Sequence, residues 1–233
     1  MAMSSFMVMS GISHTRRDHD HLRRHIRDGE DVRLRDVTTS YAVLAVAGPN
    51  SPRLLCAVTD ADLSDDAFPP YRMRHTHIGH APVFAQRLSF TGETGGDFRH
   101  ARFRGTCARN HSEAGQPLGL RLAGGEALNA LRIEKGFLHW GADMAYTEAP
   151  YQLGLDFICK PGKTLPFIGR DACLARKADP KGPCLRSVRL ADPDAILHHN
   201  EPVLRDGQII GFVTAARSVR CRRRPWAVPC LAA

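Results

Sequence analysis

One stretch near the middle of the chain, residues 127–143, constrains the fold most strongly. It reads A-L-N-A-L-R-I-E-K-G-F-L-H-W-G-A-D, and its first half spaces apolar side chains as a helix does. Gly136 adopts a positive φ angle at little cost, so we expect the helix to stop there. The stretch therefore predicts a helix that brings Arg132 and Glu134 to the edge of a cavity lined by the following loop. The simpler interpretation is an amphipathic helix with a salt-bridged end.

The composition indicates a globular protein of a reducing compartment, and we expect a cytoplasmic location. The 233 residues suffice for one sizeable core or two small ones. Seven scattered cysteines form no C-x-x-C pair, which argues against a disulfide framework or a zinc site. His21 and His25 stand one helical turn apart but lack the Glu of a zinc motif, so we expect no metal site there. We also expect no signal peptide and no membrane partner, because no run approaches the roughly 18 apolar residues of a membrane span.

The net charge of +8 is concentrated in two short segments. Residues 96–115 hold four Arg against two acidic residues, and residues 216–233 hold five Arg and no acidic residue. One function to consider is therefore nucleic-acid binding through R-C-R-R-R-P-W at 220–226, because arginines hold phosphates and a tryptophan stacks on a base. The rest of the chain offers no basic face, so the sequence argues against nucleic acid as a partner.

The order of patterns predicts an α+β fold in two parts. Residues 1–30 predict a disordered or charged helical N-terminus. Residues 31–178 predict a partial domain in which helices cover a mixed or antiparallel sheet. After a boundary near 178–183, residues 183–233 predict a small, incomplete antiparallel β-barrel-like domain with a hairpin turn at Asp206-Gly207. The finer expectations are two strands within 31–48, strands over 77–83, 85–90 and 157–160, and helices over 118–135 and from about 170.

An ordered set of motifs also carries a family resemblance. Besides L-R-I-E-K-G and W-G-A-D, the set comprises D-V-T-T-S-Y-A-V-L-A-V-A-G-P-N-S at 36–51, F-T-G-E-T-G at 90–95, A-P-Y-Q-L-G-L at 149–155, F-I-G-R-D-A at 167–172 and H-H-N-E-P-V-L-R-D-G-Q-I-I-G-F-V-T at 198–214. Together they resemble the glycine-cleavage T-protein (aminomethyltransferase) family. The likeness is closest to the folate-binding C-terminal region of dimethylglycine and sarcosine dehydrogenases, and covers roughly residues 15–95 and 117–214.

The resemblance implies a tetrahydrofolate site. The Glu of the family's T-G-E motif contacts the folate and corresponds to Glu93, whose carboxylate suits the donor edge of a pterin. The family's Arg in L-R-x-E-x-G corresponds to Arg132, a cation for the carboxylated folate tail. Trp140 and Tyr151 are the aromatic residues expected to line the cavity.

Each of these residues also has a plain structural interpretation. Glu93 is otherwise a surface turn residue. Arg132 is otherwise half of a salt bridge to Glu134 or Asp143. Trp140 and Tyr151 would otherwise only pack against other side chains of the protein.

The family reaction moves a one-carbon unit from an amine-bound or iminium carbon to N5 of tetrahydrofolate. The family's catalytic Asp lies upstream of the matching region, and no residue here takes its place, so the catalytic residue stays unknown. No G-x-G-x-x-G fingerprint is present, so FAD is implied only if a separate flavin-containing amine dehydrogenase domain or subunit supplies it. The alternative is a catalytically inactive fragment of the same family.

The two arginine-rich segments depart from the family pattern. We hypothesise that both arise from a shifted reading frame, which gene sequencing would test. We expect residues 96–115 to be an irregular basic segment in place of a helix. The C-terminal sheet would lack its final strands and expose an edge, which predicts reduced stability and aggregation.

Overall fold

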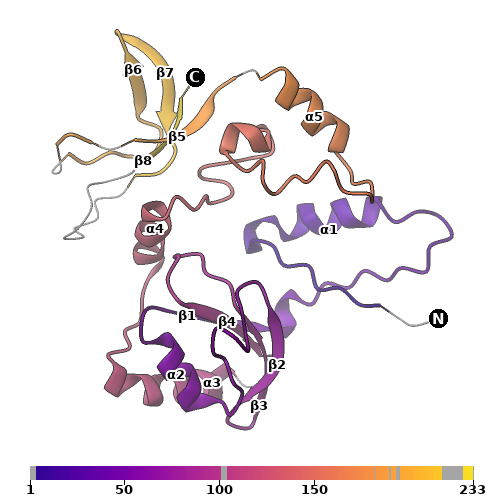
Figure 1. The fold of residues 1–233 in the computed structure, drawn as a ribbon, viewed down its shortest axis with the longest axis vertical. Coiled ribbons are helices and arrows are strands. Elements are labelled where there is room, and N and C mark those ends of the chain that lie inside the picture. Colours follow the sequence, from indigo (N-terminus) through magenta and orange to yellow (C-terminus); the bar gives the residue numbers. More distant parts are fainter. Residues whose placement is uncertain are drawn as a thin grey trace.

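The N-terminal half is built on a four-stranded antiparallel sheet with the order β1-β4-β3-β2 (Figure 1). The computed structural model describes residues 4–100, 104–180, 182–188, 190–192, 195–216 and 228–232. The strands are β1 (Ala42–Ala47), β2 (Met73–Ile78), β3 (Ala81–Gln86) and β4 (Gly95–His100). Residues 31–37, all within the described part, form no strand, so only the second of the two strands expected there exists. The β2–β3 turn lies at Gly79 and His80, earlier than the sequence pattern predicts.

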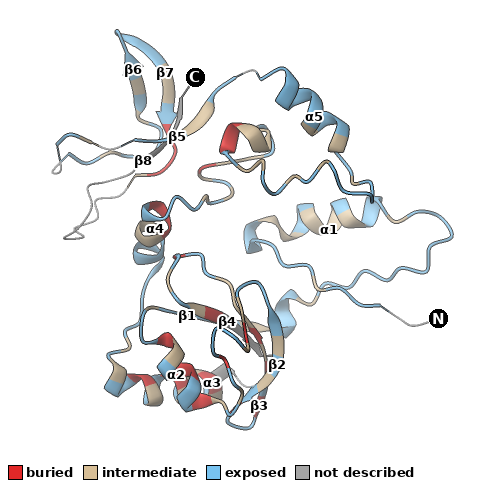
Figure 2. Cartoon of the chain, in the orientation of Figure 1, coloured by how far each residue is buried: buried red, intermediate tan, exposed pale blue. Residues whose placement is uncertain are grey.

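Helices α2 (Ser51–Val58) and α3 (Arg104–Gly115) cover one face of this sheet (Figure 1). Strand β1 alternates, so Leu44 and Val46 pack against the core while Val43 is exposed. The buried residues gather between the sheet and these helices, as the red segments of Figure 2 show. They are Leu55, Val58, Leu63, Phe68, Ile78, Ala81, Val83, Ala85 and Cys107.

The expectation of an irregular segment over 96–115 is wrong. Strand β4 pairs with both β1 and β3, and α3 follows it as a helix that packs beside α2. Cys107, His111 and Ala114 recur at helical spacing, and all three contribute to the buried side of α3. These three residues are small or polar and stand among arginines, so the sequence pattern alone does not indicate a buried helix face.

His111 makes this half of the protein sensitive to acid. The side chain is 5% exposed, and its Nδ1 atom lies 2.7 Å from the Cys107 carbonyl oxygen. Burial lowers the pKa of His111, although the hydrogen bond to that carbonyl opposes the shift. The unfolded chain therefore binds this proton more readily, so stability falls as pH drops through the ordinary histidine range.

We expect a lower melting temperature at about pH 5.5 than at about pH 7.5, on either side of the unperturbed histidine pKa. In His111→Gln, the melting temperature at the higher pH falls, but its further loss on acidification becomes smaller. Calorimetry at both pH values measures this difference. An unchanged pH dependence in the variant would show that another group is responsible.

Helix α4 (Gly125–Glu134) lies between the two halves of the molecule (Figure 1). It ends as predicted, because Gly136 has a φ of 73° and its N–H bonds to the Ile133 carbonyl oxygen. It begins later than predicted, at Gly125, with Gly124 as the residue that precedes its first turn. The remaining helices are α1 (Thr15–Arg24), α5 (Arg170–Ala178) and the short 3₁₀ turns η1 (Ile12–His14), η2 (Thr38–Ser40), η3 (Gln116–Leu118) and η4 (Pro150–Leu153). Residues 157–160 are described and form a turn followed by irregular backbone, so the strand expected there is absent.

The C-terminal half holds a second four-stranded antiparallel sheet, ordered β5-β8-β7-β6. Its strands are β5 (Cys184–Val188), β6 (Pro202–Arg205), β7 (Gln208–Val213) and β8 (Val228–Ala232). The predicted hairpin turn is confirmed, since Asp206 and Gly207 have φ angles of 52° and 78°. The expected barrel-like closure is not found within the described residues, where β5 and β6 form open edges. The expected loss of the last strands is also wrong, because β8 lies between β5 and β7.

Among the helices that the structure describes, none is both long and apolar enough to cross a membrane.

Candidate functional site

A buried ion pair fixes the junction between α4 and the loop that follows it. Arg132 comes from the last turn of α4, and its side chain is 1% exposed, while that of its partner Asp143 is 0% exposed. The guanidinium also donates to Asn129 Oδ1 over 2.7 Å and to the Phe137 carbonyl oxygen over 3.0 Å. The salt bridge to Asp143 is one of the two predicted from the sequence. The N–H groups of Arg132 thus donate hydrogen bonds to other residues of the same protein.

The Asp143 carboxylate receives two further hydrogen bonds. The His139 N–H donates to Oδ2 over 2.8 Å, which holds the loop in a tight turn. The Thr214 hydroxyl donates to Oδ1 over 2.9 Å from the end of β7. A buried carboxylate is stable only when it is paired and hydrogen-bonded, so this ion pair depends on the C-terminal half of the chain.

A cavity with a volume of ≈ 830 Å³ lies beside this ion pair and is lined by Arg132. That volume is within the range of about 300–1,000 Å³ typical of small-molecule sites. Its walls are formed by α4, the loop 139–142 and the segments 195–199 and 214–216 beside the C-terminal sheet, together with Phe90 and Leu190. Its polar lining residues are Glu126, Asn129, Arg132, His139, His198, His199 and Thr214.

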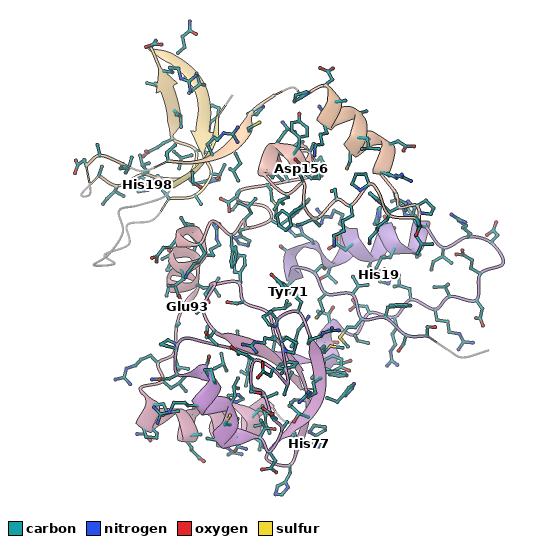
Figure 3. All side chains as sticks on the ribbon, viewed as in Figure 1. His19, Tyr71, His77, Glu93, Asp156 and His198 are labelled. Atoms are coloured by element: carbon teal, nitrogen blue, oxygen red, sulfur yellow. The ribbon has the colours of Figure 1, made fainter. Side chains whose placement is uncertain are left out.

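A second hollow of ≈ 550 Å³ contains Glu93 and shares the walls Phe90 and Leu128 with the first. In Figure 3, Glu93 and His198 lie on opposite sides of α4. The Glu93 side chain is 35% exposed, and its Oε1 atom lies 3.6 Å from Lys135 Nζ. Gly92 permits this approach, because a Cβ atom there would lie 2.5 Å from Lys135 Cγ. The two hollows adjoin at these shared wall residues, and we call the pair the trough: Glu93 lines one hollow, and His139, His198 and His199 line the other.

The two aromatic candidates lie elsewhere. Trp140 faces α1, where the Arg17 guanidinium lies 4.8 Å from its ring centroid and His14 meets it edge-on. Tyr151 is half-buried in η4. Among the described residues that line the trough, neither Trp140 nor Tyr151 occurs. The structure therefore places Arg132 and Glu93 at the trough and leaves the two aromatic residues outside it.

Sequence reasoning missed the histidines and Thr214. His198, His199 and Thr214 lie within the family-like motif at 198–214, but the pattern of that motif indicates no role for them. His139 stands in the loop directly before Trp140. The available signal was the His-His pair, placed just before a predicted hairpin whose end returns to the same site.

Two other sequence hypotheses bear on binding. In the part of the chain that the structure describes, no three His, Cys, Asp or Glu side chains gather as metal ligands do. The arginine-rich segment at 220–226, considered for nucleic acid, lies outside the described residues.

Comparison with known proteins identifies the family of this chain. The model of the GCVT N-terminal domain matches residues 1–163. The chain belongs to the glycine-cleavage T-protein family. This T-protein-like chain is 38% identical over 191 residues to dimethylglycine dehydrogenase of Rattus norvegicus, covering 82% of this chain and 22% of that protein. It is 35% identical over 218 residues to 4-methylaminobutanoate oxidase (formaldehyde-forming) of Paenarthrobacter nicotinovorans, covering 92% of this chain and 26% of that protein.

The fold of the T-protein-like chain agrees with this assignment. The glycine cleavage system aminomethyltransferase T of Bartonella henselae superimposes with a TM-score of 0.75 at 19% identity, covering 94% of this chain and 58% of that one. The family resemblance and the aminomethyltransferase-like fold expected from sequence are thus confirmed. The T-protein-like chain spans about a quarter or less of the two dehydrogenase and oxidase relatives.

Proposed function

We propose that this T-protein-like chain binds tetrahydrofolate in the trough and receives a one-carbon unit on it. The observation that carries the proposal is the pairing of a carboxylate, Glu93, with a long two-part hollow in a chain of this family. A pterin presents an amide and amino edge to such a carboxylate, which makes charge-assisted hydrogen bonds. Phe90 and Leu128, shared by both hollows, provide apolar walls for the aromatic middle of the ligand.

Arg132 and Asp143 support the site from beneath. Their ion pair is buried and hydrogen-bonded on both sides, so it holds the loop 137–143 against α4. In this proposal Arg132 lines the trough and sets its shape. Trp140 secures the outer side of the same loop through α1.

The one-carbon donor would come from another polypeptide or domain. The relatives named above are a dehydrogenase and an oxidase of methylated amines, each several times longer than this chain. We propose a flavin-containing amine dehydrogenase domain or subunit as the partner, and any FAD would belong to it. The competing proposal is a catalytically inactive fragment that retains the fold.

Titration of tetrahydrofolate into the folded chain tests the function. We expect Glu93→Gln to weaken binding by about 10-fold to 100-fold, because a hydrogen bond to a charged group contributes about 1.5–3 kcal/mol. Isothermal titration calorimetry gives the dissociation constants, and the exposed Glu113→Gln serves as the matched control.

If Glu93→Gln and the unaltered chain bind tetrahydrofolate with equal affinity, Glu93 does not contribute to the binding site. If the folded, unaltered chain does not bind tetrahydrofolate, the inactive-fragment proposal replaces this one.

A further inference from the structure

The carboxylate end of a folate needs a cationic partner, and Arg132 is already engaged. Its guanidinium donates to Asn129, to the Phe137 carbonyl and to Asp143, and only 1% of the side chain is exposed. Taking Arg132 away from Asp143 would leave a buried carboxylate without its cation, which is strongly unfavourable. The cation for the ligand tail must therefore come from another residue of the trough.

His199 has a defined orientation at the end of the trough opposite Glu93. Its Nδ1 atom lies 2.6 Å from the Thr214 carbonyl oxygen. A carbonyl oxygen only accepts hydrogen bonds, so Nδ1 carries a hydrogen atom and donates it to Thr214, and Nε2 is the ring nitrogen that remains to contact a ligand. The Thr214 hydroxyl in turn donates to buried Asp143. The ring is thus held in place by the same network that closes the ion pair.

The charges around His199 favour an anionic ligand. His198 and His139 line the same cavity, from the segment before β6 and from the loop after α4. Helix α4 contributes Glu126 and Arg132, and the Arg132 charge is balanced by Asp143. Three imidazoles and one carboxylate, that of Glu126, therefore line this end of the trough, and an imidazole with hydrogen atoms on both nitrogens donates to a carboxylate.

We propose that His199, together with His198 and His139, forms the subsite for the carboxylate end of the ligand. This inference rests on the proposed function and extends it. The pterin then lies at Glu93, the aromatic middle passes Phe90 and Leu128, and the glutamate carboxylates receive hydrogen bonds from imidazolium Nε2 of His199. The same chemistry would accept any extended ligand with an aromatic body and a terminal carboxylate.

Two fragments of the ligand separate this subsite from the pterin site. We would titrate p-aminobenzoylglutamate, which has the carboxylate end only, and tetrahydropterin, which has the pterin only, into the isotope-labelled chain. We expect p-aminobenzoylglutamate at millimolar concentrations to shift the ring resonances of His199 in NMR spectra. In His199→Asn, whose amide still donates to the Thr214 carbonyl, its binding weakens about 10-fold or more.

The matched control is His77→Asn, because His77 is exposed on the distant strand β2 (Figure 3). This variant should bind both fragments as the unaltered chain does. Tetrahydropterin binding should be insensitive to His199→Asn and should be lost in Glu93→Gln.

Each outcome decides between the two proposals. If tetrahydropterin binds and p-aminobenzoylglutamate affinity is equal in His199→Asn, the histidine subsite is wrong and the folate function stands. If p-aminobenzoylglutamate binds through His199, but tetrahydropterin does not bind and tetrahydrofolate binds no more tightly than p-aminobenzoylglutamate, the subsite stands as a general carboxylate site and the folate function fails. Absence of any binding by the folded chain overturns both.

Discussion

Replacing Asp143 with alanine is expected to lower the free energy of unfolding by about 3–5 kcal/mol. The substitution leaves the Arg132 guanidinium buried without its counter-charge and removes the acceptor of the Thr214 hydroxyl and the His139 N–H. Urea denaturation followed by circular dichroism measures the effect as a lower midpoint. A loss of this size is a large fraction of the total stability of a typical protein.

Two further variants show whether the cause is the unpaired charge. Thr214→Val removes one hydrogen-bond donor and should cost about 1 kcal/mol. The double variant Arg132→Met with Asp143→Leu removes both charges and should recover much of the lost stability. A loss below about 1 kcal/mol in Asp143→Ala would mean that water compensates the guanidinium and that the pair is not effectively buried.

Ile78→Ala is expected to lower the free energy of unfolding by about 2–5 kcal/mol. Ile78 ends β2 with 0% exposure and belongs to the core cluster of the N-terminal half. The substitution leaves a cavity there, because the sheet and the helices that cover it close only partly around the lost atoms. The midpoint of urea unfolding should fall while the slope of the transition stays unchanged.

The matched control is Ile168→Ala, since Ile168 is 68% exposed and its loss should change stability by about 0.5 kcal/mol or less. Equal effects at the two positions would indicate that the N-terminal core is loosely packed. That result would support the reduced stability expected from the sequence. A cooperative transition with the predicted difference would argue against it.

The sequence predicted those elements whose signals are local. Gly136 ends α4 because it adopts a positive φ angle, and Asp206-Gly207 forms the hairpin turn for the same reason. Helix α3 was missed because its buried stripe consists of small or polar residues, Cys107, His111 and Ala114, among arginines. Such a stripe is recognised only when α2 and the sheet are already in place.

The site was less predictable, because it depends on contacts between distant parts of the chain. The family motifs indicated Glu93 and Arg132, and both line the trough. The role of His199 depends on Thr214, whose hydroxyl binds a carboxylate 71 residues away in sequence. The position of Trp140 depends on α1, which covers its ring. Local spacing encodes neither contact.

The strand order of the C-terminal sheet has a consequence for protein synthesis. Among the strands that the structure describes, β5 pairs with β8 alone, although β6 and β7 both follow it along the chain before β8. The β6–β7 hairpin forms from neighbouring residues, whereas β5 must wait until β8 has been translated. During that interval β5 presents unpaired backbone groups and is open to pairing with other nascent chains. Slow translation between Val213 and Val228 would lengthen the time during which β5 is unpaired. A chaperone that binds extended segments would reduce the pairing of β5 with other chains in that time.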